Sequence, residues 1–503
     1  MPRSPTLSDA DAAYDPTVTS VADLPLLELA SDSGESFPVD DPATGETIRH
    51  VPRMGSAETL RALRTAEDAL PAWRGLLAKE RARIMRRWSD LMLEHAEALA
   101  RLLTTEQGKP LAESRVEIEY AASFLEWFGE EAKRVYGDTI PTYMHDRRIV
   151  VTKEPVGVTA GITPWNFPAA MVTRKAAPAL AAGCTMLLKP AEQTPLSALL
   201  FAEACRDAGL PDGVVNVVPG MGPTAGRAIV EHPNVAMISF TGSTDVGREI
   251  GSEAGRRLKP VVLELGGKAP NIVFADAQLD QAATTALYMV AYNQGQVCSA
   301  GTRLLVERSI HDEFIDRVVT HARTARVGDP LDPDTQIGAV ISPVQLQRIQ
   351  DYVEVGRQEG AELVAGGSTM SVPGHDEGWF YQPTIFRGVE SRMRIAQEEI
   401  FGPVLSVLPF ENEEEAVRIA NDVMYGLSAA IWTRDVSRAH RLAERIEAGI
   451  VFVNTMNDGR GLGSPFGGWK QSGIGLENGL EGLLACTRLK TVILNLDAPT
   501  PTL

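Results

Sequence analysis

The chain has 503 residues, with 48 lysines and arginines against 66 aspartates and glutamates, so its formal net charge is −18. A negative charge of this size repels phosphate backbones and anionic lipid, which argues against nucleic acid and membrane surfaces as partners. A chain of this length can bury more than one hydrophobic core, so two or three domains are expected.

The sequence shows no sign of a disulfide framework, a structural metal site or a membrane anchor. Its four cysteines, Cys184, Cys205, Cys298 and Cys486, lie far apart and lack CxxC spacing. Residues 1–20 are polar and aperiodic, which predicts a flexible arm and not a targeting segment. The longest apolar runs fall far short of the roughly 20 residues that cross a bilayer. We therefore expect a cytoplasmic protein without bound metal, in which any special cysteine acts through its reactivity.

Residues 57–109 have the apolar periodicity of helices. Apolar side chains from Ile84 to Leu102 recur at steps of three and four, which predicts one long helix that ends near Gly108. His95 lies on this apolar stripe and is expected to be a core histidine.

From Val156 to Gly267 short β-branched runs alternate with helical segments. Continuous apolar strands separated by helices predict a parallel sheet buried on both faces, as in doubly wound nucleotide-binding domains. Residues 268–475 alternate similarly and predict a second α/β domain, with helices near 279–293, 309–323, 343–359, 413–420 and 436–447. Segments 146–157 and 487–496 look like edge strands, which need pairing. We expect these two to form a small sheet that serves an oligomer contact.

The sequence lacks the common phosphate-binding loops. The nearest segment, GMGPTAG (220–226), has one residue too many between its last two glycines for a G-x-G-x-x-G motif. A second segment, FTGSTDVG (240–247), follows an apolar strand, breaks on Gly242 and opens a helix at a Ser or Thr cap. This geometry presents free backbone N–H groups to a diphosphate, although a βα turn without a ligand fits the same residues equally well.

Two side chains are candidates for chemistry. Cys298 lies in the polar segment NQGQVCSAG (293–301) at an expected helix-to-loop junction, where a helix end or nearby amides would lower its pKa. On the local sequence alone, an inert cysteine is the alternative. Glu264 ends the apolar strand VVLEL, where burial would raise its pKa and the following glycines allow close approach of a ligand. The alternative for Glu264 is a side chain that faces solvent or pairs with Lys268.

Seven motifs, in order along the chain, resemble signatures of the aldehyde dehydrogenase superfamily. They are TPWNFP (163–168), KPAE (189–192), FTGS (240–243), ELGG (264–267), GQVC (295–298), EIFGP (399–403) and PFGG (465–468). The resemblance implies an α/β fold with a Rossmann-type nucleotide-binding domain, an α/β catalytic domain and a small β extension for oligomerisation. The implied boundaries are 21–145 and 158–267 for NAD binding, 268–476 for catalysis, and 146–157 with 477–503 for the contact of a homodimer or homotetramer.

The resemblance also implies a mechanism for oxidising a small-molecule aldehyde. Cys298 adds to the aldehyde carbon, and its backbone N–H and the amide of Asn166 hold the oxyanion, a contact worth about 3–4 kcal/mol in comparable sites. Loss of hydride to the nicotinamide leaves a thioester, and Glu264 activates the water that hydrolyses it. Lys175 matches a family lysine that orders the oxyanion or a proton path.

For the cofactor, the resemblance implies NAD, with NADP as the alternative. Lys189 and Glu192 would hold the adenosine ribose, and a carboxylate there repels the additional phosphate of NADP. Ser243 matches a diphosphate contact, while Glu399 and Phe401 match contacts to the nicotinamide ribose and ring. The full set matched to cofactor contacts is Thr163, Pro164, Trp165, Asn166, Lys189, Glu192, Gly222, Phe240, Thr241, Gly242, Ser243, Gly266, Glu399 and Phe401.

For the substrate, residues 120–195 look most like succinate-semialdehyde dehydrogenases, in which an arginine, here Arg174, binds the carboxylate. The alternative for Arg174 is a salt bridge on a helix surface. Trp127 and Tyr292 complete the expected substrate contacts. Tyr292 stands where that branch often has another arginine, so glutarate semialdehyde or a neutral aromatic aldehyde is the alternative substrate, and Arg460 is a candidate for the missing charge.

Two other functions fit part of the pattern. A CoA-acylating semialdehyde dehydrogenase would also use Cys298, but it needs no water-activating base, so Glu264 argues against it. An inactive structural protein on the same fold would not need the complete set of Cys298, Glu264 and Asn166.

Overall fold

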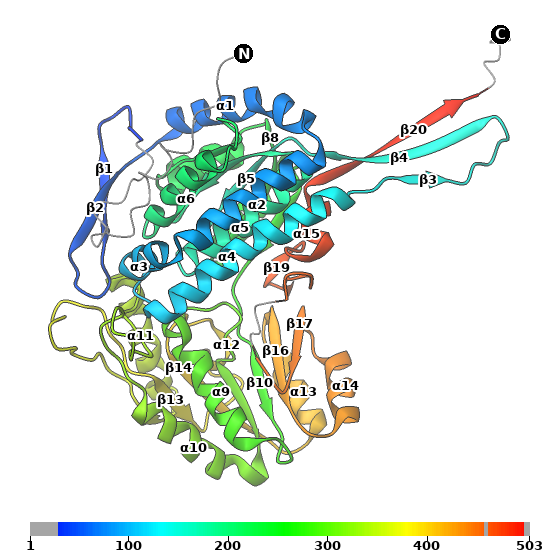
Figure 1. Cartoon of the computed structure of the whole chain (residues 1–503). Coiled ribbons are helices and arrows are strands. Elements are labelled where there is room, and N and C mark those ends of the chain that lie inside the picture. Colours follow the sequence, from blue (N-terminus) through cyan, green and yellow to red (C-terminus); the bar gives the residue numbers. More distant parts are fainter. Residues whose placement is uncertain (1–28, 457–460, 497–503) are drawn as a thin grey trace.

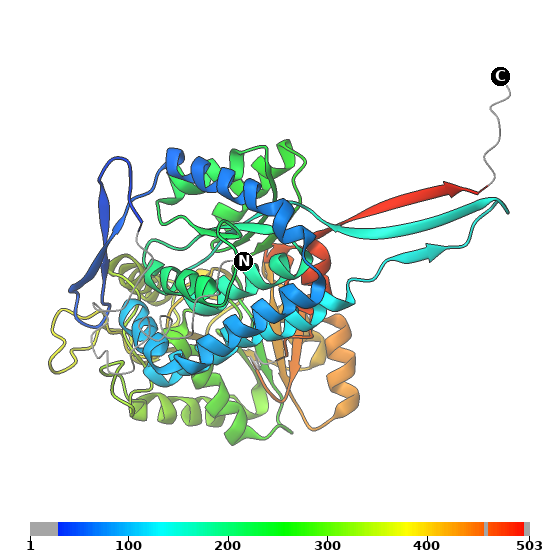
Figure 2. The same cartoon turned by 45° about the horizontal axis from the view of Figure 1, so that its top comes forward.

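The computed structural model describes residues 29–456 and 461–496, which form two large sheets with helices packed around them (Figure 1 and Figure 2). The first sheet has the order β19-β9-β8-β5-β6-β7. Its strands are β5 (Val158–Ile162), β6 (Thr185–Lys189), β7 (Val215–Val217), β8 (Val235–Thr241), β9 (Val261–Glu264) and β19 (Gly473–Ile474). Neighbours are parallel except β19 with β9. The order changes direction between β5 and β8, and ligands bind at such a point in doubly wound sheets.

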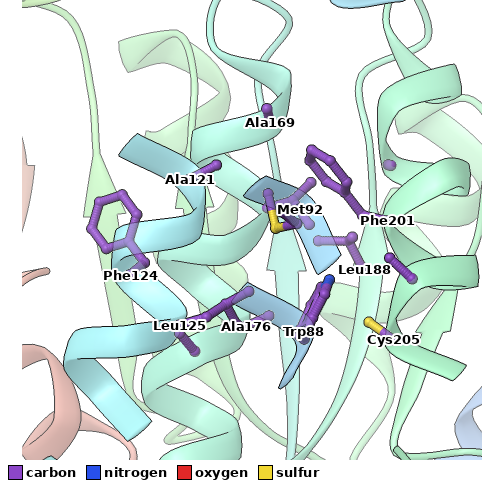
Figure 3. Close-up of a cluster of buried hydrophobic side chains, with 14 of the residues drawn as sticks. Trp88, Met92, Ala121, Phe124, Leu125, Ala169, Ala176, Leu188, Phe201 and Cys205 are labelled. Atoms are coloured by element: carbon purple, nitrogen blue, oxygen red, sulfur yellow. The ribbon is translucent and has the colours of Figure 1, made fainter. Parts of the chain in front are cut away.

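Both faces of this sheet are covered, as its apolar strands predict. One core lies under α2 (Ala78–Glu94), α3 (Ala96–Gln107), α4 (Leu111–Glu131), α5 (Pro168–Ala182) and α6 (Pro195–Asp207), and the other under α1 (Ser56–Gly75), α7 (Arg227–Glu231) and α8 (Thr244–Arg256). Successive residues of β6 point to opposite cores, since Met186 and Leu188 lie in the first and Leu187 in the second. Figure 3 shows the first core, in which Trp88 and Cys205 are among the buried side chains.

The single long helix expected over residues 84–102 is wrong. α2 ends at Glu94 and α3 begins at Ala96, because His95 has a non-helical backbone with φ −110° and ψ 19°. His95 is only half-buried at this break, so the expectation of a core histidine is also wrong. α3 does end where the sequence indicates, with Gly108 as its left-handed cap at φ 89°.

The second sheet has the order β12-β13-β14-β11-β10-β16-β17. Its strands are β10 (Pro270–Val273), β11 (Arg303–Glu307), β12 (Glu362–Ala365), β13 (Thr384–Arg387), β14 (Val404–Phe410), β16 (Ser428–Trp432) and β17 (Ile450–Val453). Its helices are α9 (Leu279–Ala291), α10 (His311–Thr324), α11 (Pro343–Gln358), α12 (Arg394–Gln397), α13 (Glu413–Asn421) and α14 (Val436–Arg445). The five helices expected from the sequence are present, and their ends agree within two residues.

A three-stranded antiparallel sheet projects from the body, and we call it the β extension (Figure 1). It consists of β3 (Asp138–Ile140), β4 (Arg147–Pro155) and β20 (Thr487–Asn495). β4 and β20 pair along their whole length, from Thr487 opposite Pro155 to Asn495 opposite Arg147. The two edge segments therefore form one small sheet, as their sequences predict.

Five short elements complete the described chain: β1 (Ser36–Asp40), β2 (Thr47–Pro52), β15 (Tyr425–Gly426), β18 (Trp469–Lys470) and α15 (Gly479–Ala485), beside a few single helical turns. Across residues 29–456 and 461–496, no helix has both the length and the apolar character needed to span a membrane. The flexible arm expected at residues 1–20 lies outside the described residues.

Candidate active site

Two cavities meet beside the first sheet. The first, of about 470 Å³, is lined by the segments that follow β5, β8 and β9, and we call it the sheet-edge cavity. The second, of about 600 Å³, is lined by α4, α9 and residues 461–466, and we call it the helix cavity. They have five lining residues in common: Phe167, Met171, Arg174, Cys298 and Phe466. Cys298 thus lies where the two cavities join.

Cys298 follows a turn with unusual backbone geometry. Asn293, Gln294 and Gly295 have positive φ values of 49°, 56° and 70°. On the other side, a Cβ on Gly267 would lie 2.2 Å from the Cys298 carbonyl oxygen. Only glycine allows this approach, so Gly267 serves a close contact with the chain itself, and the close approach of a ligand that the sequence predicts stays a prediction.

Burial decides the protonation of Cys298. Burial, and next the nearby carboxylate of Glu399, raise the pKa of the thiol to about 12, and Arg174 opposes this rise only in part. The lowering expected from a helix end or nearby amides is therefore wrong, because the loss of water outweighs these local effects. The thiol needs a base to become a nucleophile.

Glu264 ends β9 and lines the sheet-edge cavity. It is 3% exposed, and neither of its carboxylate oxygens has a hydrogen-bond partner in the described part of the chain. The pairing with Lys268 is absent there too, since that amine is also without a partner. Burial and then the Glu477 carboxylate raise the pKa of Glu264 well above its usual value, although Arg174 and Lys175 lower it. The direction of this shift agrees with the sequence prediction.

Hydrogen bonds hold both the side-chain amide and the backbone carbonyl of Asn166. Its Nδ2 donates to the Gln296 carbonyl oxygen at 2.9 Å, and its own carbonyl oxygen accepts from Lys109 Nζ and from Asn293 Nδ2, both at 2.8 Å. Lys109 in turn forms a buried ion pair of 2.5 Å with Glu117 on α4. An amide NH₂ group carries two donors, so one N–H of Asn166 remains for a ligand.

Arg174 and Lys175 of α5 share one carboxylate, that of Glu477. Lys175 Nζ lies 2.6 Å from Glu477 Oε1 and also donates to Ser239 Oγ at 3.0 Å and Thr241 Oγ1 at 2.7 Å. Arg174 Nε lies 2.6 Å from Glu477 Oε2, and Arg174 is 4% exposed, which excludes a salt bridge on the surface. Sequence reasoning missed Glu477, whose only signal is its place as the single acidic residue in GIGLENG (473–479).

Most residues matched to cofactor contacts line the sheet-edge cavity: Pro164, Trp165, Asn166, Thr241, Gly242, Ser243, Gly266, Glu399 and Phe401. Glu399 Oε1 accepts from the Gly267 N–H at 2.9 Å, and burial raises its pKa to about 7. The rings of Trp165 and Phe401 meet edge to face with centroids 5.2 Å apart. Arg348 of α11, which the sequence did not single out, also lines the cavity and donates to the Glu399 carbonyl oxygen at 2.5 Å.

The turn after β8 has the cap that the sequence predicts. α8 begins at Thr244, and Ser243 Oγ accepts from the Val246 N–H at 3.4 Å. A Cβ on Gly242 would lie 2.5 Å from the ring of Phe240, so glycine lets the chain turn over this ring.

Four of the other matched residues, Thr163, Lys189, Glu192 and Gly222, form a second group outside both cavities, and Phe240 lies in the core of the first sheet. Glu192 Oε1 accepts from the Gly222 N–H at 2.6 Å and lies 3.2 Å from Lys189 Nζ. The Thr163 N–H donates to the Lys189 carbonyl oxygen at 3.0 Å. The structure thus brings KPAE and the glycine-rich segment 220–226 together at the end of β6.

Of the three expected substrate contacts, Arg174 and Tyr292 line the helix cavity, and Trp127 does not. Aromatic rings follow one wall, with centroids 5.3 Å apart for Tyr288 and Tyr292 and 6.0 Å apart for Tyr292 and Phe167. This wall gives the cavity a largely apolar surface.

Sequence reasoning did not single out Tyr120 and Asn478, which are among the polar residues of the helix cavity. Both lie in segments whose local pattern is that of an ordinary helix or loop, so no sequence signal marked them. Arg460, the candidate for a second substrate charge, lies outside the described residues.

Comparisons with known proteins agree with the family resemblance of the seven motifs. A family model described as "Aldehyde dehydrogenase family" matches residues 29–492. The chain is 48% identical to glutarate-semialdehyde dehydrogenase of Pseudomonas aeruginosa, covering 90% of this chain and 93% of the relative. It is 46% identical to the NADP(+) succinate-semialdehyde dehydrogenase GabD of Escherichia coli, covering 93% and 96%. The solved structure of P. syringae AldA indole-3-acetaldehyde dehydrogenase with NAD+ and IAA has a TM-score of 0.91, 44% identity and coverage of 94% and 96%.

Proposed function

This chain belongs to the aldehyde dehydrogenase family, and from that premise we propose that it oxidises succinate or glutarate semialdehyde to the acid, with NAD as the oxidant. One observation carries the substrate proposal: the guanidinium of Arg174 is buried where the two cavities join, and its Nη2 has no hydrogen-bond partner among the described residues. A carboxylate is the natural partner for such a group. Relatives named for the same two semialdehydes support this substrate class.

In the proposed first step Cys298 attacks the aldehyde carbon. The thiol loses its proton to water in the cavity, and the carbonyl oxygen becomes an oxyanion. The Cys298 backbone N–H and the free N–H of Asn166 donate to this oxyanion. NAD held by Trp165, Glu399 and Phe401 would supply the hydride acceptor for this carbon, and Cys298 would then hold the acyl group as a thioester.

In the second step Glu264 removes a proton from water, the hydroxide adds to the thioester carbon, and the thiolate leaves with release of the acid. We assign Lys175 to a proton path, because its contact with Glu477 places a buried ionic pair next to Glu264. A free carboxylate beside Cys298 favours hydrolysis over transfer to CoA.

The residues present fit NAD at two places. We propose that Trp165, Phe401 and Glu399 hold the nicotinamide end, since they line the sheet-edge cavity beside Cys298. We assign the adenosine ribose to Lys189 and Glu192. A carboxylate at this place accepts from ribose hydroxyls and repels the extra phosphate of NADP, so NAD is the preferred cofactor and NADP the alternative.

A neutral aromatic aldehyde is the second candidate substrate, because one wall of the helix cavity consists of aromatic rings. Such rings contact an aromatic substrate by offset or edge-to-face packing. Tyr292 belongs to this wall and supplies no cation. Among the described lining residues, Arg174 is therefore the only cation that could bind a substrate carboxylate.

We further propose that the β extension joins copies of this chain in a homodimer or homotetramer. β20 exposes Leu489 and Ile493, which are 70% and 57% exposed in the single chain.

The proposed division assigns 21–145 and 158–267 to NAD binding, 268–476 to catalysis, and 146–157 with 477–503 to assembly. Four free cysteines fit a reducing compartment, and we place the enzyme in the cytoplasm.

The test of the substrate proposal is a panel of kcat/KM values with succinate semialdehyde, glutarate semialdehyde and benzaldehyde, each with NAD and with NADP. Arg174→Ala should lower kcat/KM for the semialdehydes by about 10–100-fold, since a charged hydrogen bond is lost, and for benzaldehyde by less than about threefold. Arg256→Ala, at a side chain that is 75% exposed, is the control. An equal loss on all three aldehydes overturns the role of Arg174, and a wild-type preference for benzaldehyde favours the aromatic candidate.

A further inference from the structure

The helix cavity contains two buried polar groups without partners. Arg174 is 4% exposed and Asn478 is 5% exposed, and both line this cavity. Within residues 29–456 and 461–496, Arg174 Nη2 and Asn478 Oδ1 have no hydrogen-bond partner. Burial of an unsatisfied donor or acceptor is costly, and such groups are rare in folded proteins. Two residues that line one cavity thus carry a strong donor and an acceptor that have no partner among the described residues.

The side chain of Asn478 does not cap the helix that follows it. Its φ of 57° and ψ of −177° lie in a region that favours glycine. Asn478 directly precedes α15, where an asparagine usually accepts a hydrogen bond from the first turn, yet its side chain makes no such cap. Its amide instead lies within hydrogen-bond reach of the Tyr120 hydroxyl, which also lines the cavity.

The chemistry of these groups selects a substrate. A carboxylate alone pairs with Arg174, but it has no donor to offer the Asn478 oxygen, which stays unsatisfied. A hydroxyl on the carbon next to the carboxylate supplies the missing donor. Glu477 links the two groups, because its carboxylate contacts Arg174 and it directly precedes Asn478 in the chain.

We propose that Asn478 is a specificity-determining residue, whose Oδ1 accepts a hydrogen bond from a substrate hydroxyl beside the carboxylate that Arg174 binds. The preferred substrate class is therefore a hydroxylated semialdehyde. This inference rests on the proposed function, because it takes the anion to lie at Arg174.

The test compares kcat/KM for malate semialdehyde and for succinate semialdehyde, which differ by one hydroxyl next to the carboxylate. In the wild type this ratio should be about ten, the effect of one net hydrogen bond. Asn478→Gly removes the amide and suits the backbone, so the ratio should fall to about one while the Tm does not fall. Asn478→Leu, which keeps the branched shape and removes the polarity, should abolish the ratio as well.

Leu258→Gly provides the control for backbone strain. Leu258 also has a positive φ of 55° and is 91% exposed, so this variant reports the change in Tm from relief of strain alone and should keep the wild-type ratio. A wild-type ratio of one or below, a ratio that persists in Asn478→Gly, or an equal loss on both substrates overturns the proposal. Failure of the proposed function appears differently, as equal wild-type kcat/KM for succinate semialdehyde and butanal.

Discussion

The oxyanion contact assigned to Asn166 predicts a specific loss in Asn166→Ala. One N–H of its amide donates to the Gln296 carbonyl oxygen at 2.9 Å. The other N–H is the donor to the oxyanion, and the alanine variant lacks it. Removal of one such donor costs about 3 kcal/mol of transition-state stabilisation, which corresponds to about 100-fold in kcat. The cysteine loop should persist, because Asn293 Nδ2 still donates to the Gln296 carbonyl oxygen at 3.2 Å. We expect a cost to folding of only about 1 kcal/mol.

The assay is steady-state kcat and KM at saturating NAD, together with urea unfolding of each variant. Asn216→Ala is the matched control, because Asn216 Nδ2 donates to the Gly213 carbonyl oxygen at 2.6 Å and lines neither cavity. It should lose a similar amount of stability and no kcat. A loss of less than about tenfold in Asn166→Ala, or a loss confined to KM, would refute the oxyanion role.

Three further predictions concern protonation and burial. Glu264→Gln should accumulate a covalent acyl-enzyme on Cys298 that intact mass detects, and normal steady-state turnover would contradict the base role. In the free enzyme, alkylation of Cys298 by iodoacetamide should rise about tenfold per pH unit between about pH 7 and about pH 10, because the thiolate fraction grows towards a raised pKa. A plateau within that range would show that the pKa is not raised. Lys109→Met should lower the free energy of unfolding by about 3–5 kcal/mol, since it leaves Glu117 buried without its cation. Arg86→Met, which removes an exposed ion pair with the same helix, should cost less than about 1 kcal/mol, and equal losses in urea would contradict the argument.

Short-range patterns predicted much of the fold. The apolar runs of the first sheet and the helices of the second half lie where the sequence places them, because burial on one face imposes its period on the residues. The break at His95 escaped this reasoning. α2 and α3 bury side chains on one continuous stripe, and periodicity reports which face is buried but not whether the backbone remains helical between the two helices.

The site could be located from the sequence but not fully described. Motifs marked Cys298 and Glu264, whereas Glu477 escaped because its contact with Lys175 joins residues 302 positions apart. The sign of the Cys298 pKa shift was wrong for the same reason. It depends on how much water the distant segments exclude, and no local residue reports this. Trp127 was expected in the substrate cavity from its neighbourhood in the sequence, yet it lies outside the lining.

The chain from β19 to β20 connects the catalytic centre directly with the β extension. Gly473 pairs with Glu264 on β9, Glu477 then reaches α5, and α15 leads into β20 at Thr487. Glu264 and the first residue of β20 are thus connected through the short, well-contacted stretch of chain from Gly473 to Thr487. We therefore expect that a change that detaches β20 from β4 lowers turnover as well as assembly.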